Sequence, residues 1–272
     1  MTTIRGRGLL IGLLGLLCVL SPAAGAAPTA QAQAVTGEIT VFAAASLTDA
    51  FNEIGQSFQN DNPGASVTFN FGGSNTLRAQ LDQAGGADVF ASADQTQMDM
   101  AQQNGDLAGD PQLFAHNLLT IIVPSANPQA VQGVCDLAKP GLRFVTSQPS
   151  VPVGQYTQQV LQKATPTPCG ANFQSQVQAN IVSQETDVRQ LVAKVQLGEA
   201  DAGVSYTTDV TPQVRDQVTE IAIPDSLNTL ASYPIALANG ANLTGGQAFV
   251  DYVLSPTAQD ILARWGFQTV TS

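Results

Sequence analysis

Mostly apolar runs alternate with amphipathic segments along this chain from about residue 39 onward. Residues 39–44 read ITVFAA, a run typical of a buried strand, and Phe51, Ile54 and Phe58 then recur at helical spacing. Residues 67–71 alternate apolar and polar side chains like a second strand, and a helical pattern follows them. This opening predicts repeated units of strand, turn and helix.

The same alternation continues to the carboxyl end of the chain. Further strands are expected at residues 87–91, 118–123, 142–146, 180–183, 202–206, 218–223 and 233–238, with helical patterns between most of them and at 246–254 and 257–265. Such alternation predicts an α/β fold with largely parallel sheets. In folds of this kind, ligands bind at the carboxyl ends of strands, where helices begin.

The amino terminus has the layout of a secretory signal peptide, predicted over residues 1–26. Arg5 and Arg7 precede an apolar stretch at 9–20, and small residues at 24–26 offer a cleavage site. The stretch is too short to span a membrane, and no later run approaches 18 apolar residues. We therefore expect an exported protein with a short disordered leader at residues 27–36.

Three cysteines add to this picture. Cys18 is a less favoured site of lipid attachment, because the residues before it lack the usual small residue and apolar residues continue beyond it. Cleavage of the signal leaves Cys135 and Cys169. In an oxidising compartment such a pair is more often a disulfide than a metal site, and no histidine lies at ligand spacing.

The chain is acidic, with a formal net charge of -11. Two of its ten basic residues lie in the signal, which leaves eight against 21 acidic residues, a balance of -13. Nucleic acid is disfavoured as a partner, because phosphate backbones require a basic surface. Solubility of an exported protein explains the acidity more simply than recognition of a basic partner does.

Four predicted helix starts could supply hydrogen-bond donors to one site. Ser46 follows a strand and resembles an N-cap with a capping box to Asp49. Ser74 has the same kind of position, after two glycines able to take positive φ and to let backbone approach a ligand. Val153 and Val188 begin two more helices. Together, helix amino termini can hold an anion without lysine or arginine.

Each of these residues also has an ordinary interpretation. Ser46 and Ser74 could be simple helix caps, and Val153 and Val188 could be ordinary helix residues. Tyr206, at the end of an apolar run, could be a half-buried strand tyrosine whose hydroxyl needs some partner. No single position decides between the two interpretations.

The combination of motifs is more specific. The segments FAAASLTDAF, FNFGGSNTLRAQL, GGADVFASAD, VPVGQY, TDVRQLV and GEADAGVSYTTDV occur in this order. Together they resemble the molybdate-binding protein of bacterial molybdate ABC importers, over about residues 37–265. The resemblance implies a type II periplasmic binding protein fold. In such a fold two α/β lobes, residues 37–116 with 232–272 and residues 117–231, are joined by a hinge.

The resemblance also implies a ligand set and partners. Molybdate, and with it tungstate, would be bound by the hydroxyls and amides of Ser46 and Ser74, the amides of Val153 and Val188, and the hydroxyl of Tyr206. A monomer would deliver the anion to a membrane permease, with no cofactor and no catalysis. The stretch between Val153 and Val188 is longer than the family pattern and contains TPTPCGANF, which a disulfide from Cys169 to Cys135 would anchor.

Elementary chemistry supports a site made of donors alone. Molybdate and tungstate are fully deprotonated near neutral pH, so their oxygens only accept hydrogen bonds, which serine, tyrosine and backbone N–H can donate. A carboxylate in the site would repel the dianion and would accept a bond from a protonated anion such as phosphate. We therefore expect the carboxylates of Asp49 and Asp187 to point away from the guest.

Two other classes of function stay open at this point. A serine hydrolase could use Ser46 or Ser74, but GxSxG is absent and the only histidine, His116, lies at a predicted crossing between lobes. A receptor of the same fold could instead take sulfate, ferric iron or an organic solute. The tyrosines are scattered along the sequence, which argues against an iron receptor. Trp265 lies in the last helix, away from the predicted helix starts, which argues against a solute that stacks on an aromatic ring.

Overall fold

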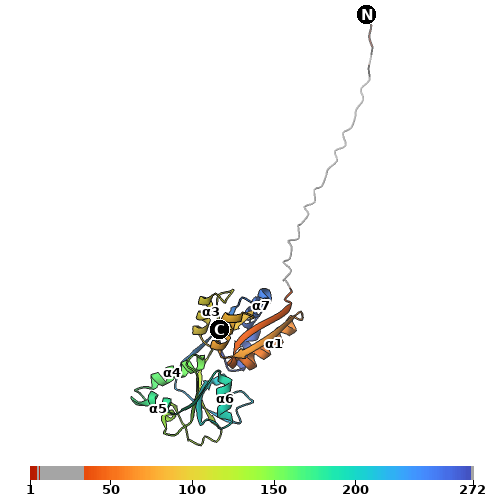
Figure 1. The fold of residues 1–272 in the computed structure, drawn as a ribbon. Coiled ribbons are helices and arrows are strands. Elements are labelled where there is room, and N and C mark those ends of the chain that lie inside the picture. The colour runs from red at the N-terminus through yellow and green to blue at the C-terminus, as the bar shows by residue number, and fades with distance from the viewer. Residues whose placement is uncertain (5, 7–33, 271–272) are drawn as a thin grey trace. The chain divides into compact units, whose positions relative to one another are not determined.

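Two β-sheets organise the chain in the computed structural model, which describes residues 1–4, 6 and 34–270. Most of the predicted signal peptide, Cys18 and most of the leader fall on residues 5 and 7–33, outside the described residues. Residues from Ala34 onward form a compact unit of their own. Figure 1 shows α1, α3 and α7 around one sheet of this unit and α4, α5 and α6 around the other.

The first sheet has six strands in the order β11-β4-β10-β3-β1-β2. These strands are β1 (Gly37–Ala44), β2 (Ala65–Gly72), β3 (Val89–Ala91), β4 (Gln112–Asn117), β10 (Ala231–Leu237) and β11 (Gln268–Thr269). Two of its inner strands, β1 and β3, alternate their buried side chains between the two faces. The first lobe, as the term is used below, is this sheet with its helices.

Helices cover both faces of the first sheet. They are α1 (Thr48–Asp61), α7 (Leu243–Val253) and α8 (Pro256–Arg264) on one face, and α2 (Ser74–Ala84) and α3 (Gln95–Asn104) on the other. On α1 the buried side chains include Phe51, Ile54 and Phe58, as the helical spacing predicted. Within the part of the chain that the structure describes, no helix is long and apolar enough to cross a membrane.

The second sheet has five strands in the order β7-β6-β8-β5-β9. These are β5 (Leu119–Pro124), β6 (Phe144–Ser147), β7 (Ile181–Glu185), β8 (Ala202–Tyr206) and β9 (Val218–Ala222). The helix α6 (Val188–Gln196) packs on one face through Leu191, Val192 and Val195. On the other face lie α4 (Pro152–Ala164) and α5 (Phe173–Ala179). The second lobe is this sheet with these helices.

Both sheets are mixed, so the prediction of largely parallel sheets was wrong. Strand β1 is parallel to β2 and β3, and β6 is parallel to β7 and β8, as strand and helix alternation requires. In contrast, β10 is antiparallel to β3 and β4, and β5 is antiparallel to β8 and β9. The antiparallel pairs involve the strands next to the two places where the chain passes between the sheets.

These two crossings lie side by side. The first is Leu118, between β4 and β5, and the second runs through residues 223–230, between β9 and β10. Strands β4 and β10 pair beside the crossings, with Ala231 opposite Asn117 and Tyr233 opposite Ala115. The sequence placed the crossings near these residues but did not reveal β4, whose short stretch QLFAHN has weak alternation.

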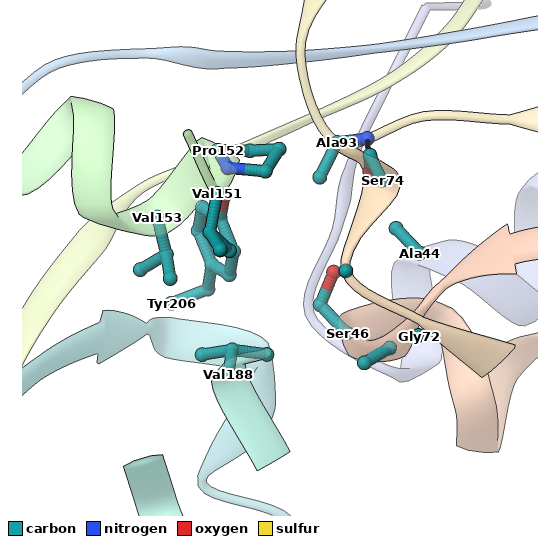
Figure 2. Close-up of a pocket in the computed structure, with 12 residues that line it drawn as sticks. Ala44, Ser46, Gly72, Ser74, Ala93, Val151, Pro152, Val153, Val188 and Tyr206 are labelled. Atoms are coloured by element: carbon teal, nitrogen blue, oxygen red, sulfur yellow. Dashed lines mark hydrogen bonds between the residues drawn. The ribbon is translucent and has the colours of Figure 1, made fainter. Parts of the chain in front are cut away.

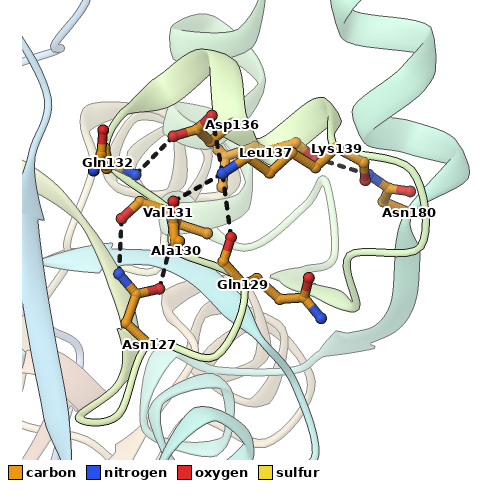
Figure 3. Close-up of polar contacts among 9 residues, drawn as sticks. All are labelled: Asn127, Gln129, Ala130, Val131, Gln132, Asp136, Leu137, Lys139 and Asn180. Carbon is orange, nitrogen blue, oxygen red and sulfur yellow. Dashed lines mark hydrogen bonds and ion pairs between the residues drawn. The ribbon is translucent and has the colours of Figure 1, made fainter.

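A disulfide joins Cys135 and Cys169 in the second lobe, as predicted. Cys135 lies in a segment, residues 127–139, whose side chains form hydrogen bonds within the segment (Figure 3). The ammonium of Lys139 donates to the carbonyl of Ala130 at 2.8 Å and lies 3.2 Å from Asp136 Oδ1. The disulfide therefore anchors the longer connection after α4 to a segment that is already ordered by polar contacts.

Candidate functional site

A small pocket lies where the two lobes meet, and all five residues predicted from the sequence line it (Figure 2). The lining consists of Ala44, Ala45, Ser46, Gly72, Gly73, Ser74, Ala93, Val151, Pro152, Val153, Val188 and Tyr206. The cavity measures about 10 Å³, close to the least that holds one water-sized guest. A larger guest therefore requires the lining to move apart slightly.

Ser46 contributes a buried hydroxyl from the first lobe. It lies in a 3-10 turn, Ala45–Leu47, between β1 and α1, and no side chain caps this turn. The capping box predicted with Asp49 is therefore absent, because the tight turn moves the start of α1 to Thr48. Instead, Ser46 Oγ lies 3.0 Å from the hydroxyl of Tyr233.

Ser74 contributes a second buried hydroxyl from the same lobe. It is the first residue of α2, and the cap position before it is occupied by Gly73, so the predicted cap role of Ser74 was wrong. The Oγ of Ser74 accepts a hydrogen bond of 3.0 Å from the backbone N–H of Ala93. That bond uses a lone pair of Ser74 and leaves its hydroxyl proton for another acceptor.

The glycines before Ser74 serve a purpose other than positive φ. Neither Gly72 nor Gly73 takes positive φ, contrary to the prediction. A Cβ on Gly73 would lie 2.3 Å from the carbonyl oxygen of Thr186, in the turn before α6. Gly73 thus permits close approach, but to the backbone of the second lobe.

Two helices of the second lobe begin at the pocket. Pro152 is the first residue of α4, where a missing N–H costs nothing, and Val153 follows it. A Cβ on Gly154 would lie 2.3 Å from the carbonyl oxygen of Gln148, so glycine lets the first turn pack against the end of β6. Val188 begins α6, capped by Asp187, whose carboxylate accepts from the N–H of Gln190 at 3.0 Å.

Tyr206, the last residue of β8, places a phenol in the pocket from the second lobe. Its side chain is 1% exposed, and among the described residues its hydroxyl has no hydrogen-bond partner. Burial raises the pKa of Tyr206 well above its ordinary value, so the hydroxyl stays protonated at neutral pH. A buried donor without a protein partner points to a guest as its acceptor.

In the part of the chain that the structure describes, no charged side chain lines the pocket, yet an ion pair lies beside it. Arg189 of α6 pairs with Asp49 of α1, and its Nε donates to the carbonyl of Ala45 at 3.3 Å. These contacts join the two lobes at one edge of the pocket. At another edge Asn75 donates to the hydroxyl of Ser150 at 3.2 Å.

Two buried carboxyls lie near the site without lining it. Burial raises the pKa of Asp94 to about 6, although the N–H of Gln97 and the hydroxyl of Ser92 donate to it. Burial likewise raises the pKa of Asp209 to about 6, opposed by nearby Arg189. Each keeps one carboxylate oxygen without a hydrogen-bond partner among the described residues.

Three of the tyrosines lie close together in space although they are far apart in the sequence. The rings of Tyr156 and Tyr233 lie 6.4 Å and 5.8 Å from that of Tyr206, in edge-to-face arrangements. The argument from scattered tyrosines against an iron receptor was therefore wrong. Only Tyr206 of this cluster lines the pocket, and residues 34–270 contain no group of three histidine, cysteine or acidic side chains able to hold a metal ion.

The sequence did not indicate the residues behind the pocket. Tyr233, Asn117 and Ala93 support the two serines, yet they come from β10, from the end of β4 and from the turn after β3. Tyr233 lies near a predicted crossing, which was its only sequence signal. Its proximity to Ser46, 187 residues away in the chain, depends on strand pairing in the first sheet.

Comparison with known proteins shows the family of this chain. A family model described as bacterial extracellular solute-binding protein matches residues 39–268. The chain belongs to this family. Within the bacterial extracellular solute-binding proteins, it is 38% identical to "Molybdate-binding protein ModA" of Mycobacterium tuberculosis (strain ATCC 25618 / H37Rv), covering 97% of this chain and 98% of that protein.

Two solved structures of solute-binding proteins share the fold. The periplasmic molybdate-binding protein of Azotobacter vinelandii matches with a TM-score of 0.72 at 21% identity, covering 84% of this chain and 98% of its own. The sulfate-binding protein SubI of Mycobacterium tuberculosis H37Rv matches with a TM-score of 0.76 at 18% identity, covering 86% and 87%. At these identities the likeness concerns the two-lobed fold.

Proposed function

We propose that this protein captures molybdate, and tungstate of nearly equal size, in the pocket between its lobes and delivers the anion to an ABC importer. The ligands are the five residues named from the sequence: Ser46, Ser74, Val153, Val188 and Tyr206. One observation carries the proposal: two serine hydroxyls, a tyrosine hydroxyl without a partner among the described residues, and the starts of α2, α4 and α6 meet at one pocket. The 38% identity with a molybdate-binding protein supports the choice of anion.

The chemistry of the lining matches a fully deprotonated dianion. Hydroxyl and N–H groups donate hydrogen bonds, and helix amino termini carry partial positive charge. Within residues 34–270, no lysine, arginine, aspartate or glutamate lines the pocket. A site of neutral donors can compensate the buried charge only if nearly every oxygen of the guest finds a donor.

Capture requires motion, which we assign to the two crossings. The moving lobes are close to the bounds expected from the sequence, residues 37–116 with 232–272 and residues 117–231, except that Asn117 and Ala231 move with the first lobe, to which β4 and β10 belong. Opening would break the contacts of Arg189 with Asp49 and of Asn75 with Ser150, and closure around the guest would restore them. The protein works as an exported monomer that takes one anion and docks on a membrane permease.

The test is calorimetric titration of the mature protein with molybdate, tungstate, sulfate and phosphate. We expect tight binding of molybdate and tungstate at one anion per chain, with sulfate much weaker. Sulfate has shorter bonds, so fixed donors would reach it only through long, weak hydrogen bonds. Equal affinity for sulfate would overturn the choice of molybdate, and absence of binding by any oxyanion would overturn the proposal itself.

The same titration of Ser74→Ala tests the ligand set. Loss of one hydrogen bond to a charged guest should weaken molybdate binding about 10- to 100-fold. Ser66→Ala, an exposed serine in β2, is the matched control and should bind as the wild type does. Unchanged affinity of Ser74→Ala would remove Ser74 from the ligand set.

The geometry does not favour the hydrolase alternative. His116 Nδ1 lies 3.3 Å from Ser232 Oγ, and neither residue lines the pocket. Ser46 contacts Tyr233, and Ser74 accepts from Ala93, so neither pocket serine has a histidine beside it to act as a base. The relatives are named for binding rather than for catalysis.

A further inference from the structure

A chain of buried hydrogen bonds runs from the first crossing to the pocket. Asn117 Nδ2 lies 3.4 Å from the hydroxyl of Tyr233, and that hydroxyl lies 3.0 Å from Ser46 Oγ. All three side chains are buried, so water does not compete for their hydrogen bonds. Which atom donates and which accepts in each of these hydrogen bonds follows from Asn117, whose amide orientation is fixed.

The fixed end is the amide of Asn117. The backbone N–H of Leu118 donates to Asn117 Oδ1 at 2.9 Å, and the hydroxyl of Thr207 donates to the same oxygen at 3.1 Å. A backbone N–H can only donate, so this contact identifies the oxygen and places Nδ2 on the other side. There Nδ2 donates to the hydroxyls of Thr208, at 2.8 Å, and Tyr233.

The donor and acceptor roles of Tyr233 and Ser46 follow from this assignment. Because an amide nitrogen has no lone pair to offer, the oxygen of Tyr233 is the acceptor, and its own proton is left for Ser46 Oγ. A buried phenol that failed to donate would leave an unsatisfied group, which is costly. Ser46 therefore accepts from Tyr233, and its own proton faces the pocket that it lines.

The surroundings of Tyr233 hold its hydroxyl in place and keep it protonated. Its ring lies edge to face with Tyr206 at 5.8 Å and with Phe267 at 5.5 Å. Burial raises the pKa of Tyr233 well above its ordinary value. Both the orientation and the proton are thus available at neutral pH.

We infer that Tyr233, oriented by Asn117, is a positioning residue that turns the hydroxyl proton of Ser46 toward the guest, so that Ser46 meets the guest as a hydrogen-bond donor. This inference rests on the proposed oxyanion site and deepens it. A guest oxygen that bears a proton needs an acceptor, whereas Ser46 in this arrangement turns its proton toward the guest and has one of its two lone pairs occupied by Tyr233. The chain of bonds therefore favours fully deprotonated oxyanions over phosphate, which keeps a proton near neutral pH.

The hydrogen bonds from Asn117 through Tyr233 to Ser46, called the relay below, begin at the predicted hinge. Asn117 ends β4 beside the first crossing, while Thr207 and Thr208 directly follow Tyr206 of the pocket. The bonds of Asn117 to these threonines connect the strand of the first lobe to the second lobe. The orientation of the Ser46 hydroxyl is thus tied to the place where the lobes are joined.

The decisive experiment is a double-mutant cycle on molybdate affinity, measured by calorimetry. Tyr233→Phe removes only the hydroxyl and should weaken binding about 5- to 20-fold. In a Ser46→Ala background the same change should add less than about twofold, because Tyr233 acts through Ser46. Equal effects in both backgrounds, or no effect in the wild-type background, would overturn the inference.

Tyr252→Phe is the matched control for loss of a tyrosine hydroxyl. Its hydroxyl bonds to Ser57 at 2.8 Å and Asp61 at 3.0 Å, and none of these residues lines the pocket. Its molybdate affinity should equal that of the wild type. If the wild type binds no oxyanion, the proposed function fails with the inference; if only Tyr233→Phe is without effect, the inference alone fails.

Asn117→Asp gives a second route that does not alter Tyr233. The introduced carboxylate still accepts from Leu118 but cannot donate, so Tyr233 would donate to it and Ser46 would donate to Tyr233. Lone pairs of Ser46 would then face the pocket. We expect molybdate binding to weaken at least about tenfold and the ratio of phosphate to molybdate affinity to rise. A fall in affinity for both anions in equal proportion would contradict the relay.

Discussion

Asp94 combines a structural role with an unfavourable charge. Its Oδ1 caps α3 by accepting from the N–H of Gln97 at 2.9 Å, while its Oδ2 has no partner among the described residues. Burial raises its pKa to about 6, and burial also raises the pKa values of Tyr156 and Tyr206, to which the charge of Asp94 adds. Such a carboxyl destabilises the folded state whenever it is ionised.

The sign of the pH dependence follows from linkage. A pKa near 6 in the folded state lies above the unfolded value of about 3.9, so between these values only the folded state holds the proton. The contribution of Asp94 to stability therefore falls as pH rises from about 4 to 6, by on the order of 2–3 kcal/mol.

We predict that Asp94→Asn removes this pH dependence. The difference in unfolding free energy between the variant and the wild type should shift in favour of the variant by about 1–2 kcal/mol from pH 5 to pH 7.5. Urea unfolding at several pH values measures it, with Asp251→Asn, an exposed aspartate in α7, as the control for loss of one charge. The slope is the readout, because a buried amide adds a constant offset; a difference that stays constant with pH would contradict the prediction.

At the scale of elements, the pocket depends on how closely the start of α2 approaches the turn before α6. Gly73 makes this approach possible, and its φ of -63° and ψ of 132° are open to any residue. The requirement for glycine therefore comes from Thr186 of the second lobe rather than from the local backbone. Arg189 and Asn75 add polar contacts across the same junction.

Gly73→Ala is expected to hinder the approach of the lobes and leave each lobe folded. The added methyl would lie 2.3 Å from a backbone oxygen, which cannot turn away as a side chain could. Molybdate affinity should fall at least about tenfold, while unfolding free energy without ligand changes by less than about 1 kcal/mol. Calorimetry and urea unfolding check the two halves of this expectation.

Gly133→Ala is the matched control for this change. A Cβ there meets nothing within 4 Å, and the backbone is extended, with φ of -177°. Its affinity and stability should stay close to those of the wild type. If Gly73→Ala bound molybdate as tightly as this control, the close approach of Gly73 to Thr186 would play no part in capture.

At the scale of the whole molecule, the disulfide stabilises the second lobe and takes no part in lining the pocket. Cys135 and Cys169 are 34 residues apart and both lie in the second lobe, and neither lines the pocket. A crosslink of this length stabilises chiefly by restricting the unfolded chain. Side-chain bonds such as those of Lys139 hold the same segment without it (Figure 3).

Replacing both cysteines by serine should lower the unfolding free energy by about 2–4 kcal/mol. Molybdate affinity should stay within about twofold of the wild type, because the start of α4 and the start of α6 do not depend on the disulfide. Urea unfolding and calorimetry of the double variant measure the two quantities. A large loss of affinity with intact secondary structure would show that the disulfide positions the second lobe.

Sequence periodicity and the order of the motifs were enough to predict several elements of the fold and the family. The buried faces of α1 and α6, the strand at Ala202–Tyr206 and the family all followed from the sequence. Residues three or four apart on a helix share a face whatever the rest of the chain does, so neighbouring residues decide these features. The five residues singled out as ligands were named through the family resemblance, which the order of the motifs carries.

Tertiary structure decided what depends on distant partners. Strand directions, the partners of Ser46 and Ser74, the need for Gly73 and the clustering of Tyr156 and Tyr233 about Tyr206 all join segments far apart in the chain. A sequence pattern shows that a hydroxyl is present, but its hydrogen-bond direction depends on which donor folding brings beside it. Whether a pocket hydroxyl donates or accepts is therefore a property of the folded molecule.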